Sequence, residues 1–185
     1  ALFVVTGDER WWELATACSA YERERYWNAE ESGFDFTPVG CEPRCSGEWT
    51  DGALPASNHI ALFNYATIRL LSDEPVYGET FAALQNRFTQ EAARYPSAGC
   101  YGLIGCHRMK ESVVIVQGDD VQELRSFLLA KASALLPIVP ANQQSGAAAL
   151  RKQSTQETAY WVCSEQGCSV ELNSREELVA LLTAR

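Results

Sequence analysis

The densest group of side chains that could do chemistry lies in residues 49–59. Asp51 and His59 carry the two groups that most often move protons near neutral pH, a carboxylate and an imidazole, so they are the candidate catalytic pair. Trp49 offers a flat apolar ring and Asn58 an amide, so these two are the candidate substrate-binding residues. Asn58 and His59 would lie in the first turn of a helix, where free N–H groups and the helix dipole favour anions or oxygen-rich ligands.

Each of these residues also has an ordinary structural interpretation. Ser57 or Asn58 would serve as the N-cap of the helix that follows. The pair Asp51-Gly52 is typical of a tight turn. A single His near a single Asp is found in many proteins as a satisfied, partly buried polar group, so the pattern leaves both interpretations open.

The chain has seven cysteines, an odd number, and no tight Cys-x-x-Cys spacing. We expect them to be free, buried, reduced thiols that act as small apolar side chains, with one fortuitous disulfide among them. The secondary alternative is a four-cysteine zinc site built from two local pairs, Cys41 with Cys45 and Cys163 with Cys168. Only two His are present, which excludes a His-rich metal site, and we expect no metal and no cofactor.

Two further motifs carry little chemistry. Gly118-Asp119-Asp120 has the position of a phosphate loop, but its two carboxylates would repel a phosphate, so a capped helix start is the better interpretation. Cys106 and His107 are adjacent on a predicted helix and point about 100° apart, so they cannot form a nucleophile–base pair.

Composition narrows the class of protein. The 185 residues contain 15 Lys and Arg against 24 Asp and Glu, a formal net charge of −9. This acidity argues against a nucleic-acid partner, because phosphate contacts need clustered basic residues. No apolar run is long enough to span a membrane, and no leader peptide is visible. We therefore expect an intracellular protein, in the cytoplasm or in an organelle such as the mitochondrion.

Helical periodicity dominates residues 1–110. The apolar run at residues 1–5 reads as the end of one helix, and Thr6-Gly7-Asp8 as its stop and the cap of the next. Residues 33–37 suggest a short strand or hairpin, and residues 38–56 a long loop. The predicted helices cover residues 8–27, 57–71, 75–94 and about 97–109.

The pattern changes after residue 110. Residues 113–116 are a run of β-branched residues typical of a buried strand, followed by a helix over about 120–134. Further strands are predicted at 136–139 and 159–162, and Ser174-Arg175-Glu176-Glu177 predicts a capping box for a last helix. The predicted fold is thus mainly α, with helical hairpins over 1–110 and a small βαββα unit over 111–185.

Several runs together resemble one known family. They are Thr6-Gly7-Asp8, Gly33-Phe34-Asp35-Phe36-Thr37, Asp51-Gly52-Ala53-Leu54-Pro55-Ala56-Ser57-Asn58, Arg94-Tyr95-Pro96, Val113-Val114-Ile115-Val116-Gln117-Gly118-Asp119, and Ala159-Tyr160-Trp161-Val162-Cys163 with Cys168. In order and spacing they resemble the later part of the thioredoxin-domain-containing family that includes spermatogenesis-associated protein 20. Members of that family resemble proteins in which a thioredoxin-like domain is joined to an (α/α) toroid. The toroid is of the N-acylglucosamine 2-epimerase or six-hairpin glycosidase type.

The resemblance implies that residues 1–110 are the last helical hairpins of a toroid and that residues 111–185 are its C-terminal appendage. Two hairpins alone cannot enclose a toroid site, since such a site takes carboxylates from hairpins around the whole ring. We therefore expect a non-catalytic structural or interaction subunit. Its partners would be other protein subunits or a missing N-terminal part of the same polypeptide. The alternative is the C-terminal piece of a carbohydrate-active enzyme, either a sugar epimerase or a glycosidase.

Overall fold

The chain forms two compact units in the computed structural model, which describes residues 2–108, 112–132, 136–141, 152–164 and 167–184. The helical unit is Leu14–Lys110, and the sheet unit is Ala1–Glu13 with Glu111–Arg185. The predicted domains share the division after residue 110. The first 13 residues, however, make their contacts with the C-terminal part rather than with the helices that follow them.

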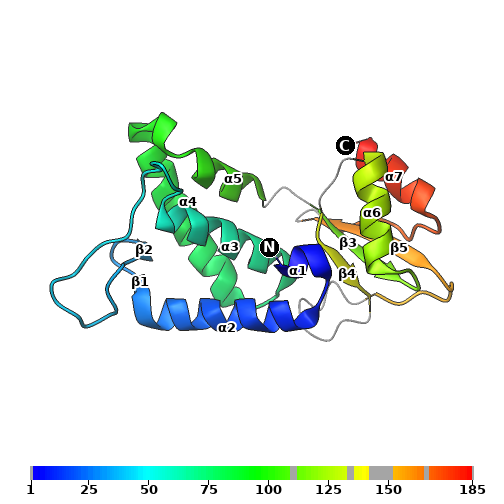
Figure 1. Cartoon of the computed structure of the whole chain (residues 1–185), viewed down its shortest axis with the longest axis horizontal. Coiled ribbons are helices and arrows are strands. Elements are labelled where there is room, and N and C mark those ends of the chain that lie inside the picture. The colour runs from blue at the N-terminus through cyan, green and yellow to red at the C-terminus, as the bar shows by residue number, and fades with distance from the viewer. Residues whose placement is uncertain (1, 109–111, 133–135, 142–151, 165–166, 185) are drawn as a thin grey trace. The chain divides into compact units, whose positions relative to one another are not determined.

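The helical unit is built from a bundle of helices and a small hairpin (Figure 1). Its elements are α2 (Glu9–Tyr26, which begins in the sheet unit), β1 (Trp27–Asn28), β2 (Gly33–Phe34), α3 (Ser57–Leu71), α4 (Pro75–Arg94), the 3-10 turn η1 (Pro96–Ala98) and α5 (Cys100–Arg108). Strands β1 and β2 pair in antiparallel fashion, with Trp27 opposite Phe34. The predicted helices are therefore present, and the region predicted as a short hairpin forms one.

Helix α3 is the centre of this unit and packs against both α4 and α5. The large apolar residues at helical spacing along α4 (Tyr77, Phe81, Leu84 and Phe88) are all buried. The buried residues of α3 do not form one stripe: Ile60 is 40% exposed, whereas Leu62 and Tyr65 are fully buried. A helix covered by neighbours on two sides buries more than one stripe, and a single periodic face cannot describe it.

Helix α2 leaves two large apolar side chains in water, since Leu14 and Tyr21 are both more than half exposed. The buried positions include Trp12 and Ser19, and the Ser19 backbone carbonyl accepts a hydrogen bond from the Tyr65 hydroxyl at 3.0 Å. This hydrogen bond joins α2 to α3 at a polar position.

The sheet unit contains a four-stranded mixed sheet in the order β4-β3-β5-β6. Strand β3 runs parallel to β4, and β5 is antiparallel to both β3 and β6. The elements are α1 (Leu2–Thr6), β3 (Val113–Gln117), α6 (Val121–Ala132), β4 (Ile138–Pro140), β5 (Ala159–Ser164), β6 (Gly167–Cys168) and α7 (Arg175–Thr183). This order confirms the predicted C-terminal α/β unit. Most of the predicted 141–157 loop lies outside the described residues.

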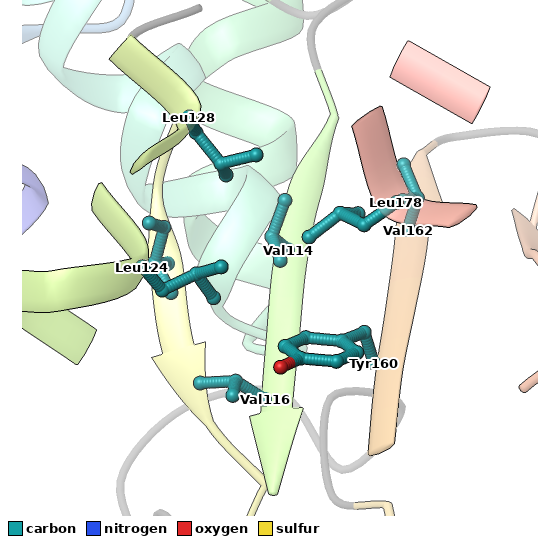
Figure 2. Packing of buried hydrophobic residues seen from close by; sticks show 8 residues of the cluster. Val114, Val116, Leu124, Leu128, Tyr160, Val162 and Leu178 are labelled. Carbon is teal, nitrogen blue, oxygen red and sulfur yellow. The ribbon is translucent and has the colours of Figure 1, made fainter. Parts of the chain in front are cut away.

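Helices α6 and α7 cover one face of this sheet, and Figure 2 shows their side chains reaching the strands. Alternate residues of a strand point to the same face, so Val114 and Val116 of β3 join Tyr160 and Val162 of β5. Leu124 and Leu128 from α6 and Leu178 from α7 complete the core (Figure 2). The predicted capping box is present in part, since the Ser174 hydroxyl accepts from the Glu177 backbone N–H at 3.1 Å.

The N-terminal segment forms the predicted helix end. Gly7 closes α1 with a φ of +69°, and its N–H donates to the Phe3 carbonyl at 2.8 Å. Phe3 and Trp12 are buried, with ring centroids 5.5 Å apart, whereas Leu2 is 53% exposed. Among the described helices, none combines the length and apolar character needed to cross a bilayer.

Taken together, the chain is mainly helical, with a small mixed sheet in its C-terminal half, which confirms the coarse fold class predicted from the sequence.

Candidate functional site

The loop of residues 38–56 carries the candidate residues to the start of α3, and backbone bonds tie its second half to neighbouring segments. The Gly47 N–H donates to the Phe34 carbonyl at 3.1 Å, and the Glu48 N–H donates to the Ser57 hydroxyl at 3.1 Å. A Cβ on Gly47 would collide with the Phe34 carbonyl oxygen, so only glycine allows this approach. The loop is therefore held against the hairpin and against α3.

Asp51 is the most connected side chain of the site. Its Oδ1 accepts from the Ala56 N–H at 2.9 Å, and its Oδ2 accepts from the Tyr101 N–H at 2.8 Å. The Asp51 N–H in turn donates to the Ala98 carbonyl at 2.7 Å. Asp51 thus joins the loop to the first turn of α5, where N–H groups lack partners within the helix and favour a carboxylate.

His59 completes this group from the first turn of α3. Its Nδ1 lies 2.7 Å from Asp51 Oδ1, and because a carboxylate only accepts, Nδ1 carries the hydrogen. The side chain is fully buried, and its Nε2 makes no hydrogen bond to any residue in the described part of the chain. The rings of Trp49 and Phe88 lie edge-on to the imidazole, with centroids 6.1 and 5.1 Å away.

The charge of Asp51 is stabilised by these bonds. Burial raises the pKa of this carboxyl, but hydrogen bonds from the Ala56 and Tyr101 N–H groups and from His59 outweigh burial and leave the pKa below its usual range. A carboxylate held in this way is a poor proton acceptor. Its low pKa fits a charge that stabilises structure better than a general base working near neutral pH.

The Asn58 side chain also makes hydrogen bonds that hold the fold together. Its Oδ1 accepts from the Phe34 N–H at 2.7 Å, and its Nδ2 donates to the Phe34 carbonyl at 3.1 Å. The amide therefore pairs with Phe34 as a neighbouring strand would, and it is fully buried. The predicted N-cap role of Ser57 or Asn58 is wrong, because the N-cap position of α3 is Ala56 and no side chain caps the helix there.

The structure thus brings together Asp51, His59 and Trp49 and directs Asn58 to the hairpin. The sequence offered no sign of the partners that use them, namely the backbone of Phe34 and Tyr101 and the ring of Phe88. A pair separated by 24 residues, or by 50, leaves no periodic signal. Trp49 is half-buried and none of the four residues lines the surface pocket described next.

A surface pocket of about 290 Å³ lies instead between the hairpin and the first half of the loop. Asp35 is at its wall, where its carboxylate accepts from Asn28 Nδ2 at 3.2 Å and from Arg44 Nε at 2.5 Å. Of the candidate residues predicted from the sequence, Cys41 lies in its lining. Its lining is Trp27, Asn28, Ala29, Glu30, Asp35, Pro38, Val39, Gly40, Cys41, Glu42 and Arg44.

A polar cluster in the sheet unit was likewise not anticipated. The Asp119 carboxylate accepts from Arg175 Nε at 2.8 Å and from the Tyr160 hydroxyl at 2.6 Å. It ties the loop before α6 to β5 and to the start of α7. Asp120 instead caps α6, accepting from the N–H groups of Gln122 and Glu123, as expected for a capped helix start.

The cysteines match the expected single disulfide but not the expected burial of the free thiols. Cys163 and Cys168 form a disulfide, so their sulfurs are not available to zinc in this structure. Cys41 and Cys45 are free thiols in the other unit. Four of the five free cysteines are exposed, because they lie in the loop, on the outer side of α2 and at the start of α5. Within the described ranges, no group of three or more Cys, His, Asp or Glu is placed to hold a metal.

Comparison with known proteins gives no match. Neither the family models, nor the curated proteins, nor the solved structures include one similar enough to report.

Proposed function

We propose that this chain is a non-catalytic structural or interaction module that packs against other protein, with a helical unit of the (α/α)-toroid type and a small α/β appendage. The observation that carries the proposal is how the candidate catalytic residues are used. Every hydrogen-bonding atom of the Asp51 and Asn58 side chains serves the fold, and His59 is sealed from solvent. A substrate that used these atoms would compete with hydrogen bonds that hold the loop in place.

The outer surface of the helical unit supports an interaction role. Leu103 and Ile104 are adjacent on α5 and are 56% and 53% exposed. On α2, Leu14 and Tyr21 are 53% and 58% exposed. Contiguous apolar side chains left in water are typical of surfaces that another protein covers, and Leu103 and Ile104 are contiguous. The packing of α3 against α4 and α5 is the kind of helix pairing that a toroid repeats.

The test is the oligomeric state of the purified chain. We expect self-association or aggregation, measured by light scattering coupled to size-exclusion chromatography, and we expect Leu103→Lys with Ile104→Lys to reduce it. Leu129→Lys is the matched control, since Leu129 is an exposed helical leucine of the sheet unit. A wild-type chain that is a stable monomer at all concentrations would contradict the proposal.

The alternative, a piece of a carbohydrate-active enzyme, is supported by one observation. The Nε2 atom of His59 has no hydrogen-bond partner among the described residues and lies beside Trp49. If a sugar hydroxyl supplies that partner after the loop opens, amino sugars or short glycans will bind to the wild type and not to His59→Ala. Absence of binding to a folded wild-type chain would reject this alternative.

A further inference from the structure

The disulfide joins the end of β5 to β6, the short edge strand of the sheet. Cys163 of β5 and Cys168 of β6 are directly opposed in the strand register, with Cα atoms 3.9 Å apart. The other five cysteines are free thiols, so one oxidised pair coexists with reduced ones in the same chain. The sheet hydrogen bonds already hold β5 in place, so the disulfide is free to have a role besides stabilising the sheet.

We propose that the Cys163–Cys168 disulfide is a site of reversible thiol–disulfide exchange, entered through Cys168 by a dithiol reductant. The two sulfurs differ in access: Cys163 is 5% exposed, whereas both residues of β6 are exposed. An attacking thiolate therefore reaches Cys168 and not Cys163. Access of this kind, together with the identity of the sulfur attacked, sets the rate of exchange.

The step balances with the dithiol as the reductant. The thiolate of the dithiol forms a bond to Cys168 Sγ, and the Cys163–Cys168 bond breaks. The electron pair of the broken bond stays on Cys163 Sγ, which takes a proton. The second thiol of the reductant then attacks the mixed disulfide and releases Cys168. The dithiol becomes a cyclic disulfide, and the protein gains two electrons and two protons as a pair of thiols.

Opening the bond would release only the short pairing of β6 with β5. Strand β6 is two residues long, and it pairs with β5 only at Cys163–Cys168 and Ser164–Gly167. The segment that follows is held independently: Ser169 donates its N–H to the Val162 carbonyl at 2.8 Å, and its hydroxyl accepts from the Val162 N–H at 3.0 Å. A local opening of this size costs far less than unfolding the sheet.

The same segment keeps the two sulfurs close after reduction. Tyr160 and Leu172 exchange both backbone hydrogen bonds at 2.9 Å, which fixes the return path of the chain beside β5. Cys163 stays in the sheet through its pairing with Val113 of β3. Because the closed loop is short, the entropic cost of bringing the thiols together again is small, and an oxidant can reform the bond.

One tryptic peptide, residues 153–175, holds both cysteines and no other, so its mass reports the redox state of this site alone. The intact native chain is treated with dithiothreitol, alkylated with N-ethylmaleimide and digested. We expect the untreated peptide to lack two hydrogens and carry no alkyl group, and the reduced one to gain two alkyl groups while the circular dichroism of the chain is unchanged. Oxidised glutathione, added after the reductant is removed, should restore the unalkylated form.

Two single variants test the point of entry. In Cys163→Ser the remaining Cys168 thiol should react with N-ethylmaleimide at least about tenfold faster than the Cys163 thiol of Cys168→Ser, because only the former is exposed. Equal rates would overturn entry through Cys168. Alkylation of both cysteines without reductant, or reduction only after the chain is denatured, would overturn the exchange site itself.

Discussion

Asp51 Oδ1 and His59 Nδ1 lie 2.7 Å apart, and this contact is one of several that converge on the same carboxylate. Asp51 also receives the N–H groups of Ala56 and Tyr101, so one side chain links the loop, the start of α3 and the start of α5. A residue that resembles half of a proton-transfer pair therefore works as the junction of three segments. We therefore expect replacement of Asp51 to lower the stability of the folded chain.

Asp51→Asn should lower the free energy of unfolding by about 1–3 kcal/mol, because the amide offers one acceptor oxygen where the three N–H groups need a carboxylate. The measurement is the denaturant midpoint of the purified chain. Glu79→Gln, at an exposed carboxylate of α4, is the control and should change stability by less than about 0.5 kcal/mol. Equal effects of the two variants would contradict the role of Asp51 as a junction.

Asn58→Ala should cost about 2–4 kcal/mol, since it leaves the Phe34 N–H buried without its acceptor and opens a small cavity. Asn64→Ala is the matched control on the same helix, because Asn64 is exposed. The readout is again the free energy of unfolding in denaturant. If Asn58→Ala were as mild as Asn64→Ala, the Phe34–Asn58 pairing would contribute nothing to stability.

The sequence was a good guide where the signal is local. The limits of α3 at residues 57 and 71, and of α4 at 75 and 94, follow from apolar spacing, from Pro75 in the first turn and from the breaks on either side. The N-cap at Ser174 is likewise read from four adjacent residues. Each of these features depends on residues within one or two helical turns.

The candidate site was harder to predict from the sequence, because its contacts join residues that are far apart along the chain. His59 and Asp51 were identified as a pair, but their roles depend on the Tyr101 N–H, 50 residues beyond Asp51. Which atoms a carboxylate accepts from is decided by packing, which has no period. For the same reason the residue types alone could not reveal that Asn58 would pair with Phe34, or that Leu14 would face solvent.

Two helical glycines should respond in opposite directions to alanine. A Cβ at Gly102 of α5 would collide with the Phe88 ring, whereas a Cβ at Gly78 of α4 would meet only the flexible Arg69 side chain at 3.9 Å. Gly78→Ala should therefore stabilise the chain by about 0.5–1 kcal/mol through helix propensity. Gly102→Ala should destabilise it by about 1–3 kcal/mol through overpacking.

Thermal unfolding of the two variants beside the wild type checks this pair. The expected order of melting temperature is Gly78→Ala above wild type and Gly102→Ala below it. A rise in both would mean that α5 does not pack against Phe88 through Gly102.

The sheet unit should lose stability in acid through Asp119. The Arg175 hydrogen bonds hold the pKa of this carboxyl below its usual range; burial opposes them, and the Tyr160 hydroxyl adds to them. Because the pKa is lower in the folded chain than in the unfolded one, the stabilisation is complete above about pH 4 and is lost as the pH falls through the folded pKa.

Asp119→Asn removes that titration. We expect it to cost about 1–3 kcal/mol at pH 7 and to flatten the dependence of unfolding free energy on pH below about pH 4. Denaturant titrations of wild type, Asp119→Asn and the exposed control Glu79→Gln, carried out between about pH 2.5 and pH 7, measure both effects. Parallel pH profiles for wild type and Asp119→Asn would show that the ion pair with Arg175 does not stabilise the folded chain.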